Sequence, residues 1–211
     1  MSLPAPPLLV ISDRSQAKRP LAEIAAAAFR AGCRWFSLRE KDLPAEERRR
    51  LLGELVALGH RYAATISVHD DVDAAIGESA GGVHLPSGGD PAAARRRLGP
   101  GVLIGVSAHS PQEAAAQIEA GADYATLSPI FLTQSKPSYG PAVGLAALEA
   151  AARRAAGPVV ALGGIDADNI AACVAAGAAA IAVMGEVMRA ADPEAAVRRL
   201  LAALATASRR A

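Results

Sequence analysis

Histidines stand near the ends of short apolar runs, where they could move protons. His109 follows the run at residues 103–107. Imidazole gains and loses a proton near neutral pH, so His109 is the first candidate for proton transfer; the alternative is a local hydrogen bond at the start of a helix. His69 beside Asp70 is either a base with its orienting carboxylate or a pair of metal ligands, although no third ligand is evident nearby. His84 lies within an apolar run and is predicted to be a hydrogen-bonded core residue.

Glycines follow two consecutive apolar runs near the end of the chain. Gly163 and Gly164 come after residues 159–162, and Gly185 follows Met184 at the end of the next run. Glycine exposes bare backbone N–H groups, which can bind a phosphate together with a helix N-terminus. The alternative is that these glycines serve ordinary tight turns. Their position after two neighbouring runs favours the phosphate site.

Two basic residues follow an earlier run. Arg39 and Lys41 alternate along the chain, so both side chains can face the same side and neutralise a second anionic group. The alternative is a solvated pair that starts the next helix, which also accounts for Glu40 and Asp42.

A long polar segment lies between two of the later runs. Residues 128–141 include Thr133, Ser135 and Lys136 among prolines and glycines. This segment is longer than most connections between a strand and a helix, and a long polar loop of this kind indicates a lid over a site.

Elements of two kinds must position these residues. Apolar runs that suit strands buried on both faces alternate with alanine-rich stretches at helical period. Eight predicted strands lie at 8–13, 35–40, 65–70, 82–85, 103–107, 124–128, 159–163 and 180–184. Eight predicted helices lie near 21–31, 45–58, 72–79, 91–98, 111–120, 145–155, 168–176 and 193–206.

This alternation predicts one α/β domain over residues 1–211, a TIM (β/α)8 barrel. A doubly wound sheet would place a glycine-rich loop after the first strand, and the sequence there is ISDRSQAKRP. In a TIM barrel the carboxyl ends of all the strands meet at one rim. The candidate residues, with Ser107 at the end of the fifth strand, are therefore predicted to converge.

Composition excludes several classes of protein. The 211 residues are 52% apolar, and 22 basic residues against 21 acidic ones give a net charge of +1. A near-neutral chain without a basic helix is not expected to bind nucleic acid, and no long apolar window predicts a membrane span. The two cysteines, Cys33 and Cys173, are too few for a disulfide framework. They are predicted to pack in the core of a cytoplasmic protein. The sequence is compatible with both a monomer and a homo-oligomer.

The ordered motifs resemble the thiamine-phosphate synthase and TenI superfamily of thiamin biosynthesis, whose members are TIM barrels. The matching segments are LREKD at 38–42, HDDVD at 69–73, GGVHLPSGG at 81–89, IGVSAHS at 104–110, SPIFLTQSKPSYGP at 128–141, ALGGI at 161–165 and AVMG at 182–185. The resemblance implies a small thiazole phosphate as ligand, with its phosphate held by Gly163, Gly164 and the turn at Met184 and Gly185.

A synthase joins the thiazole phosphate to a pyrimidine methyl diphosphate with Mg²⁺. By resemblance, the diphosphate would be held by Arg39, Lys41, Ser107 and Lys136, with His69 and Thr133 lining the substrate site. Asp70 would bind magnesium. Synthases usually carry a second magnesium aspartate where Gly89 stands, glutamine where Ser37 stands and asparagine where His69 stands; here the nearest second carboxylate is the displaced Asp90.

TenI-type proteins instead tautomerise a thiazole carboxylate phosphate to its aromatic form, without metal or cofactor. The PSG turn at 86–88 resembles theirs, and His109 matches the histidine to which their proton transfer is assigned. We therefore expect a thiazole tautomerase in which His109 moves the proton. Thiamine-phosphate synthase, with Asp70 and Asp90 binding Mg²⁺, is the first alternative. A non-catalytic sensor of phosphorylated ligands is the second.

Overall fold

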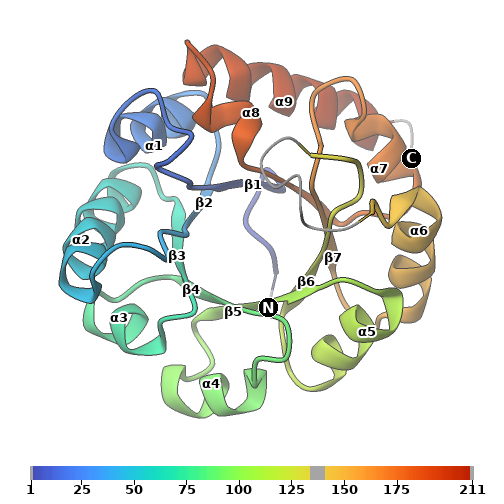
Figure 1. Ribbon diagram of the computed structural model, residues 1–211, viewed down its shortest axis with the longest axis horizontal. Helices are drawn as coiled ribbons and strands as arrows, with labels where there is room; N and C mark the ends of the chain where they lie inside the picture. The colour runs from blue at the N-terminus through green and yellow to red at the C-terminus, as the bar shows by residue number, and fades with distance from the viewer. Residues whose placement is uncertain (1, 134–140, 210–211) are drawn as a thin grey trace.

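The computed structural model describes residues 2–133 and 141–209, and its eight strands close into one parallel barrel (Figure 1). Each strand pairs with the next along the chain, and β8 pairs with β1. The strands are β1 (Leu8–Ile11), β2 (Trp35–Leu38), β3 (Thr65–His69), β4 (Gly82–Leu85), β5 (Leu103–Ala108), β6 (Tyr124–Leu127), β7 (Val159–Leu162) and β8 (Ala180–Val183). The predicted TIM barrel is confirmed.

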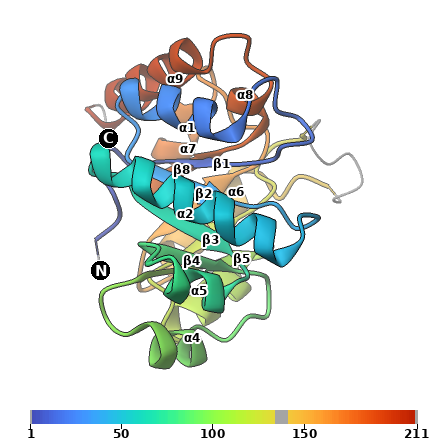
Figure 2. The same cartoon turned by 90° about the vertical axis from the view of Figure 1, so that its left-hand side faces the viewer.

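Helices surround the barrel, and α1 and α2 lie across the outer face of the first strands (Figure 2). The helices are α1 (Leu21–Arg30), α2 (Ala45–Arg61), α3 (Val72–Gly77), α4 (Pro91–Leu98), α5 (Pro111–Glu119), α6 (Gly144–Arg154), α7 (Ile170–Ala175), α8 (Gly185–Met188) and α9 (Pro193–Ser208). The short helix α8, directly after β8, was not predicted from the sequence. In the described ranges no helix is long and apolar enough to cross a bilayer.

Side-chain caps fix where several helices begin. The Asp71, Asp90, Ser110 and Asp192 side chains each accept a hydrogen bond from a backbone N–H three residues further on, at the starts of α3, α4, α5 and α9. Proline occupies the first turn of α4, α5 and α9, where no intrahelical N–H is needed. These caps set the length of the loops that follow the strands, and those loops form the rim.

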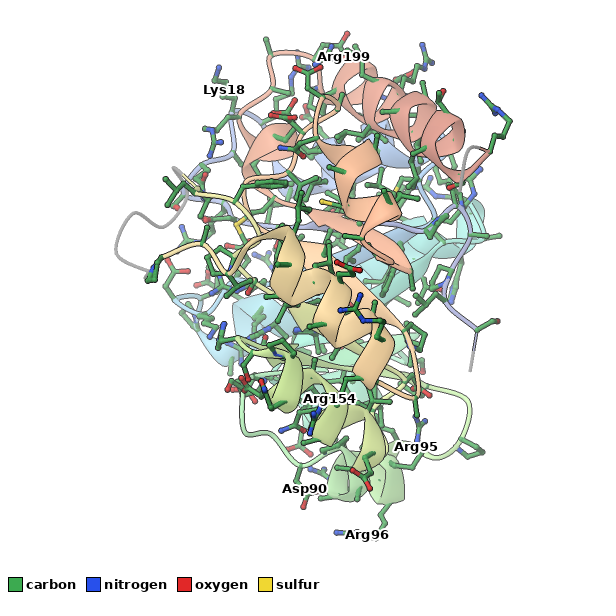
Figure 3. The ribbon with its side chains drawn as sticks, turned by 90° about the vertical axis from the view of Figure 1, so that its right-hand side faces the viewer. Lys18, Asp90, Arg95, Arg96, Arg154 and Arg199 are labelled. Carbon is green, nitrogen blue, oxygen red and sulfur yellow. The ribbon has the colours of Figure 1, made fainter. Side chains whose placement is uncertain are left out.

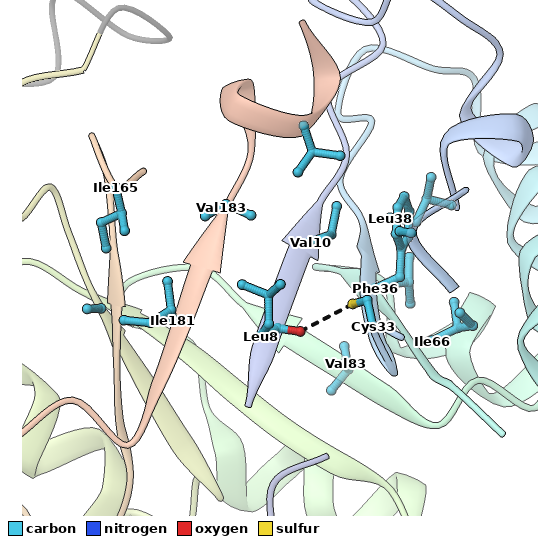
Figure 4. Packing of buried hydrophobic residues seen from close by; sticks show 14 of the residues in the cluster. Leu8, Val10, Cys33, Phe36, Leu38, Ile66, Val83, Ile165, Ile181 and Val183 are labelled. Carbon is cyan, nitrogen blue, oxygen red and sulfur yellow. Dashed lines mark hydrogen bonds between the residues drawn. The ribbon is translucent and has the colours of Figure 1, made fainter. Parts of the chain in front are cut away.

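Strand residues alternate between two cores. Leu8 and Val10 belong to one cluster with helix residues such as Ile24. Figure 4 shows Cys33 in the same cluster, where its thiol donates a hydrogen bond to the Leu8 carbonyl oxygen at 3.4 Å. Burial raises the pKa of Cys33 to about 11, so this thiol is an inert packing group, as predicted. Leu9 and Ile11 face the barrel interior with Trp35. The outer core is the larger of the two.

Aromatic rings fill the amino-terminal half of the barrel interior. Trp35 and Tyr124 meet edge to face, with ring centroids 5.0 Å apart. Gly105 leaves room for this packing, because a Cβ at that position would overlap the Tyr124 ring. The interior is therefore closed at this end, and polar side chains occupy the other.

Candidate active site

A cavity of about 530 Å³ opens at the carboxyl ends of the strands. Many of the predicted site residues line it: Arg39, Lys41, His69, Ser107, His109, Thr133, Gly163, Gly164, Met184 and Gly185. The predicted lid falls only partly within the described chain, and Ser135 and Lys136 lie outside the described residues. The convergence of the predicted residues that line the cavity follows from the barrel topology.

The β2 side of the cavity is held by a buried carboxylate. Glu40, between Arg39 and Lys41, is 2% exposed. It accepts a hydrogen bond from the Ser12 hydroxyl at 2.6 Å and from the Arg14 backbone N–H at 3.1 Å. The Ser12 oxygen in turn accepts the Arg39 N–H at 2.8 Å. Sequence reasoning placed Glu40 only in a solvated alternative, and that interpretation is wrong for this side chain.

This carboxylate links the ends of β1 and β2. Burial raises the pKa of Glu40, although the hydrogen bonds from Ser12 and Arg14 oppose that shift. A buried carboxylate with several donors fixes the loop around it, because each donor would lose a partner if the loop moved. The backbone that carries Arg39 and Lys41 is thereby positioned at the rim.

Buried His84 forms part of the cavity floor. Its Nδ1 lies 3.1 Å from the Tyr124 hydroxyl, its Nε2 lies 3.0 Å from the Ser107 hydroxyl, and its ring stacks on His69 with centroids 5.7 Å apart. Burial lowers the pKa of His84 to about 4, and Arg39 and Lys41 add to that shift. The predicted hydrogen-bonded core histidine is confirmed, and it also contacts the cavity, which the sequence did not reveal.

His109 is held at the rim by two backbone contacts. Its Nδ1 lies 2.9 Å from the Ser128 carbonyl oxygen, and its backbone N–H donates to the Glu113 carboxylate at 2.8 Å. Because a carbonyl oxygen only accepts, Nδ1 carries a hydrogen in this contact. The contact fixes the orientation of a ring that lines the cavity, and the predicted local hydrogen bond at the helix start is present as well.

The glycine turn after β7 is required by packing. Gly163 and Gly164 have φ of +100° and +64°. A Cβ on Gly163 would lie 2.7 Å from Pro129 Cα, and one on Gly164 would lie 2.5 Å from the Leu132 carbonyl oxygen. Backbone conformation and the close loop after β6 both exclude larger residues here. Tight packing thus accounts for these glycines, and phosphate binding by the turn stays a prediction.

The predicted magnesium carboxylates do not line the cavity. Asp70 is exposed at the end of β3, with φ of +54°. Asp90 caps α4 by accepting the Ala93 N–H at 2.8 Å, and Figure 3 shows it at the outer edge of the molecule near Arg96. Within the described ranges no group of three His, Cys, Asp or Glu side chains could hold a metal ion. The magnesium site stays a prediction, with Asp70 as its stronger ligand.

Three charged cavity residues were not predicted from the sequence: Asp166, Glu186 and Arg189. Asp166 lies in the loop after β7, whereas the short helix α8, which was itself not predicted, brings Glu186 and Arg189 to the cavity. Ser87 and Ser128 also line the cavity, and both carried a signal in the sequence, because they fall in the PSG turn and in the predicted lid segment.

Comparison with known proteins shows to which family the chain belongs. A family model described as thiamine monophosphate synthase matches residues 8–187. The chain belongs to the thiamine monophosphate synthase family. It is 44% identical to a thiamine-phosphate synthase of Anaeromyxobacter dehalogenans over 87% of this chain and 82% of that protein. It is 40% identical to one of Roseiflexus sp. over 94% of this chain and 85% of that protein.

Among solved structures, the thiamine phosphate pyrophosphorylase from Pyrococcus furiosus matches with a TM-score of 0.85 at 31% identity. The match covers 95% of this chain and 96% of that protein. The thiamine monophosphate synthase family therefore accounts for the whole barrel, from β1 to α8, and the resemblance read from the motifs is confirmed.

Proposed function

We propose that this protein is a thiamine-phosphate synthase, which joins a thiazole phosphate to a pyrimidine methyl diphosphate. The observation that carries the proposal is a cavity with two separate places for anions. Arg39 and Lys41 line its β2 side, whereas the glycine turns after β7 and β8 line another side, with β1 between β2 and β8. Full-length relatives that bear this name support the synthase over the tautomerase expected from the motifs.

The β2 side suits the diphosphate. Arg39 and Lys41 supply two positive charges, and the Ser107 hydroxyl lies at the neighbouring floor, bound to His84. In the reaction the bond between the pyrimidine methylene carbon and the diphosphate oxygen breaks, and the thiazole nitrogen forms the new bond to that carbon. The cations stabilise the negative charge that gathers on the departing diphosphate.

The glycine side suits the single phosphate of the thiazole. Gly163, Gly164 and Gly185 present backbone there, and Asn169 holds the turn by donating from Nδ2 to the Gly164 carbonyl oxygen at 2.9 Å. A phosphate bound by backbone groups would leave the thiazole ring to point toward the centre of the cavity. The neutral floor at His84 favours an uncharged pyrimidine ring over an ionic group.

Magnesium would need few protein ligands at this site. Mg²⁺ commonly takes one or two carboxylates together with phosphate oxygens and water, and exposed Asp70 can provide one carboxylate. When bound, Mg²⁺ would neutralise charge on the diphosphate. Asp90 is a weaker candidate, because one of its oxygens already caps α4.

A thiazole tautomerase is the second candidate, favoured by two observations. His109 is oriented through Nδ1 as an acid–base group on the cavity. The turn at Gly89 is also too crowded for an aspartate, since a Cβ there would lie 2.8 Å from Leu85 Cβ and 3.1 Å from the Pro86 carbonyl oxygen. The carboxylate that synthases usually carry at this point therefore has no room, whereas a tautomerase needs no metal.

Parallel assays of the purified protein distinguish these functions. One receives thiazole phosphate and pyrimidine methyl diphosphate, the other receives the thiazole carboxylate phosphate tautomer, and each is run with Mg²⁺ and with EDTA. We expect Mg²⁺-dependent thiamine phosphate in the first. Aromatisation in the second alone, insensitive to EDTA and lost in His109→Asn, would replace the synthase with the tautomerase. Turnover in either assay eliminates the non-catalytic sensor.

A further inference from the structure

The arginine one turn after Gly185 lies over that glycine. The one-turn helix α8 brings the Arg189 N–H to 3.0 Å from the Gly185 carbonyl oxygen. The guanidinium folds back so far that a Cβ built on Gly185 would lie 2.6 Å from both Cζ and Nη2 of Arg189. The Arg189 side chain therefore fills the space that any side chain at position 185 would need.

Backbone conformation gives no separate reason for glycine at 185. Unlike Gly163 and Gly164, Gly185 does not have a positive φ. An ordinary residue could take this backbone conformation, but its side chain would displace the guanidinium, which is the far end of the flexible Arg189 side chain. Gly185 and Arg189 thus form a pair in which one residue makes room for the other.

The guanidinium is also aimed from the loop after β1. Arg189 Nη1 donates to Gln16 Oε1, and Gln16 Nε2 donates to the Asp13 carboxylate. Burial raises the pKa of Asp13, but hydrogen bonds from Ser15 and Gln16 outweigh it and the net shift is downward, so the anchoring group stays ionised. This chain of contacts holds an exposed arginine at the edge of the cavity.

Charge at this end of the cavity singles out Arg189. Among the described lining residues from β6 to the end of the chain, it is the one arginine or lysine, and Asp166 and Glu186 are the carboxylates. Asp166 accepts hydrogen bonds from the Asn169 and Asp168 N–H groups, so its charge is used within its own turn. A guanidinium beside backbone N–H groups matches the geometry of a phosphate.

We propose that Arg189 is the cationic ligand of the substrate phosphate at the glycine turns, and that glycine at 185 is required to admit its guanidinium. The inference rests on the proposed phosphate site and adds a specificity-determining residue to it. Arg189 would select phosphorylated over unphosphorylated thiazole.

Calorimetric titration of the full-length protein with thiazole phosphate and with the dephosphorylated thiazole alcohol tests this without turnover. We expect the wild-type protein to prefer the phosphate. Arg189→Ala should reduce that preference about tenfold or more, the size of a lost charged hydrogen bond, and Arg189→Lys should restore part of it. Arg198→Ala, which removes an exposed arginine paired with Glu194 on α9, is the matched control and should leave the preference unchanged.

A second substitution tests the pairing with glycine. Gly185→Ser should weaken thiazole phosphate binding in the wild-type background, because the new side chain displaces the guanidinium. In the Arg189→Ala background the same change should cost nothing further. Additive losses would overturn the pairing.

Failure of this inference is distinguishable from failure of the proposed function. An unchanged preference in Arg189→Ala overturns the inference, even if the wild-type protein makes thiamine phosphate. No preference in the wild-type protein overturns both the phosphate site and the inference. An Arg189-dependent preference without synthase turnover keeps the inference and removes the proposed reaction.

Discussion

The β2 side and the β7–β8 side of the cavity differ in how they could hold an anion. On the β2 side, Arg39 and Lys41 extend from a loop fixed by the buried carboxylate of Glu40. On the other side, glycine turns present backbone, supplemented by the guanidinium of Arg189. A departing diphosphate gathers negative charge that positioned cations stabilise, whereas a phosphate that does not react has only to be bound and held in place. The contrast points to a reacting end on the β2 side, at Arg39 and Lys41, and an anchoring end at the glycine turns after β7 and β8.

Removing the charge at the reacting end should have the largest effect. We expect Arg39→Ala to lower kcat/KM for the pyrimidine diphosphate about 10²- to 10³-fold, because a group that stabilises the departing charge is lost. The KM for thiazole phosphate should change little. Steady-state kinetics with each substrate varied in turn measures both, with Arg50→Ala on the exposed surface of α2 as the control. A rise in the KM for thiazole phosphate as large as the rise in the KM for the pyrimidine diphosphate would show that the two ends are not separate.

At the anchoring end, backbone shape matters more than charge. Gly164→Ala places a Cβ 2.5 Å from the Leu132 carbonyl oxygen at a positive φ. We expect it to lower the free energy of unfolding by about 3 kcal/mol and to raise the KM for thiazole phosphate. Urea unfolding compared with Gly101→Ala, where a Cβ would meet nothing within 4 Å, is the matched measurement. Equal stability of the two variants would refute the packing argument.

Between the two ends, buried His84 on the cavity floor should make the folded protein less stable in acid. The pKa of His84 is about 4 in the folded protein, against 6.5 when exposed. Between those values the unfolded chain binds more protons, so stability falls as pH drops from about 6.5 toward 4. This amounts to about 2 kcal/mol at pH 5 relative to pH 8. The slope of unfolding free energy against pH should flatten in His84→Asn over that window, and an unchanged slope would contradict the assignment.

Removing the hydroxyl link that positions the backbone of Arg39 should have the smallest effect. Ser12→Ala removes the hydroxyl that joins Glu40 to the Arg39 N–H. We expect a loss of about 1 kcal/mol in unfolding free energy and a few-fold rise in KM for the pyrimidine diphosphate alone. Ser208→Ala, at the exposed end of α9, serves as the control. A Ser12→Ala enzyme with unaltered KM would mean that Ser12 does not position Arg39.

The fold was predictable because every strand, and every helix of the structure except α8, carries a signal in its own residues. Runs such as VVAL and AIAV, buried on both faces, and starts such as Ser110-Pro111 need no tertiary information to be recognised. The topology then determined which strand ends meet. Residues at those ends, such as Arg39 and His109, could therefore be named from the sequence.

Other features depend on contacts between distant segments. Glu40 is buried only because Ser12 and Arg14 supply donors from another loop. Arg189 reaches the cavity because α8 turns it back over Gly185, and no periodicity predicts a helix of one turn. The choice between synthase and tautomerase likewise depends on a few rim residues that the barrel itself does not constrain.

The central claim is that the protein binds two phosphorylated substrates at different ends of the cavity and joins them. Its most direct test is the stoichiometry of products from thiazole phosphate and pyrimidine methyl diphosphate with Mg²⁺, followed by phosphorus NMR. The account predicts one thiamine phosphate and one inorganic diphosphate for each thiazole phosphate consumed. Absence of both products, together with aromatisation of the thiazole carboxylate tautomer by the same preparation, would contradict it.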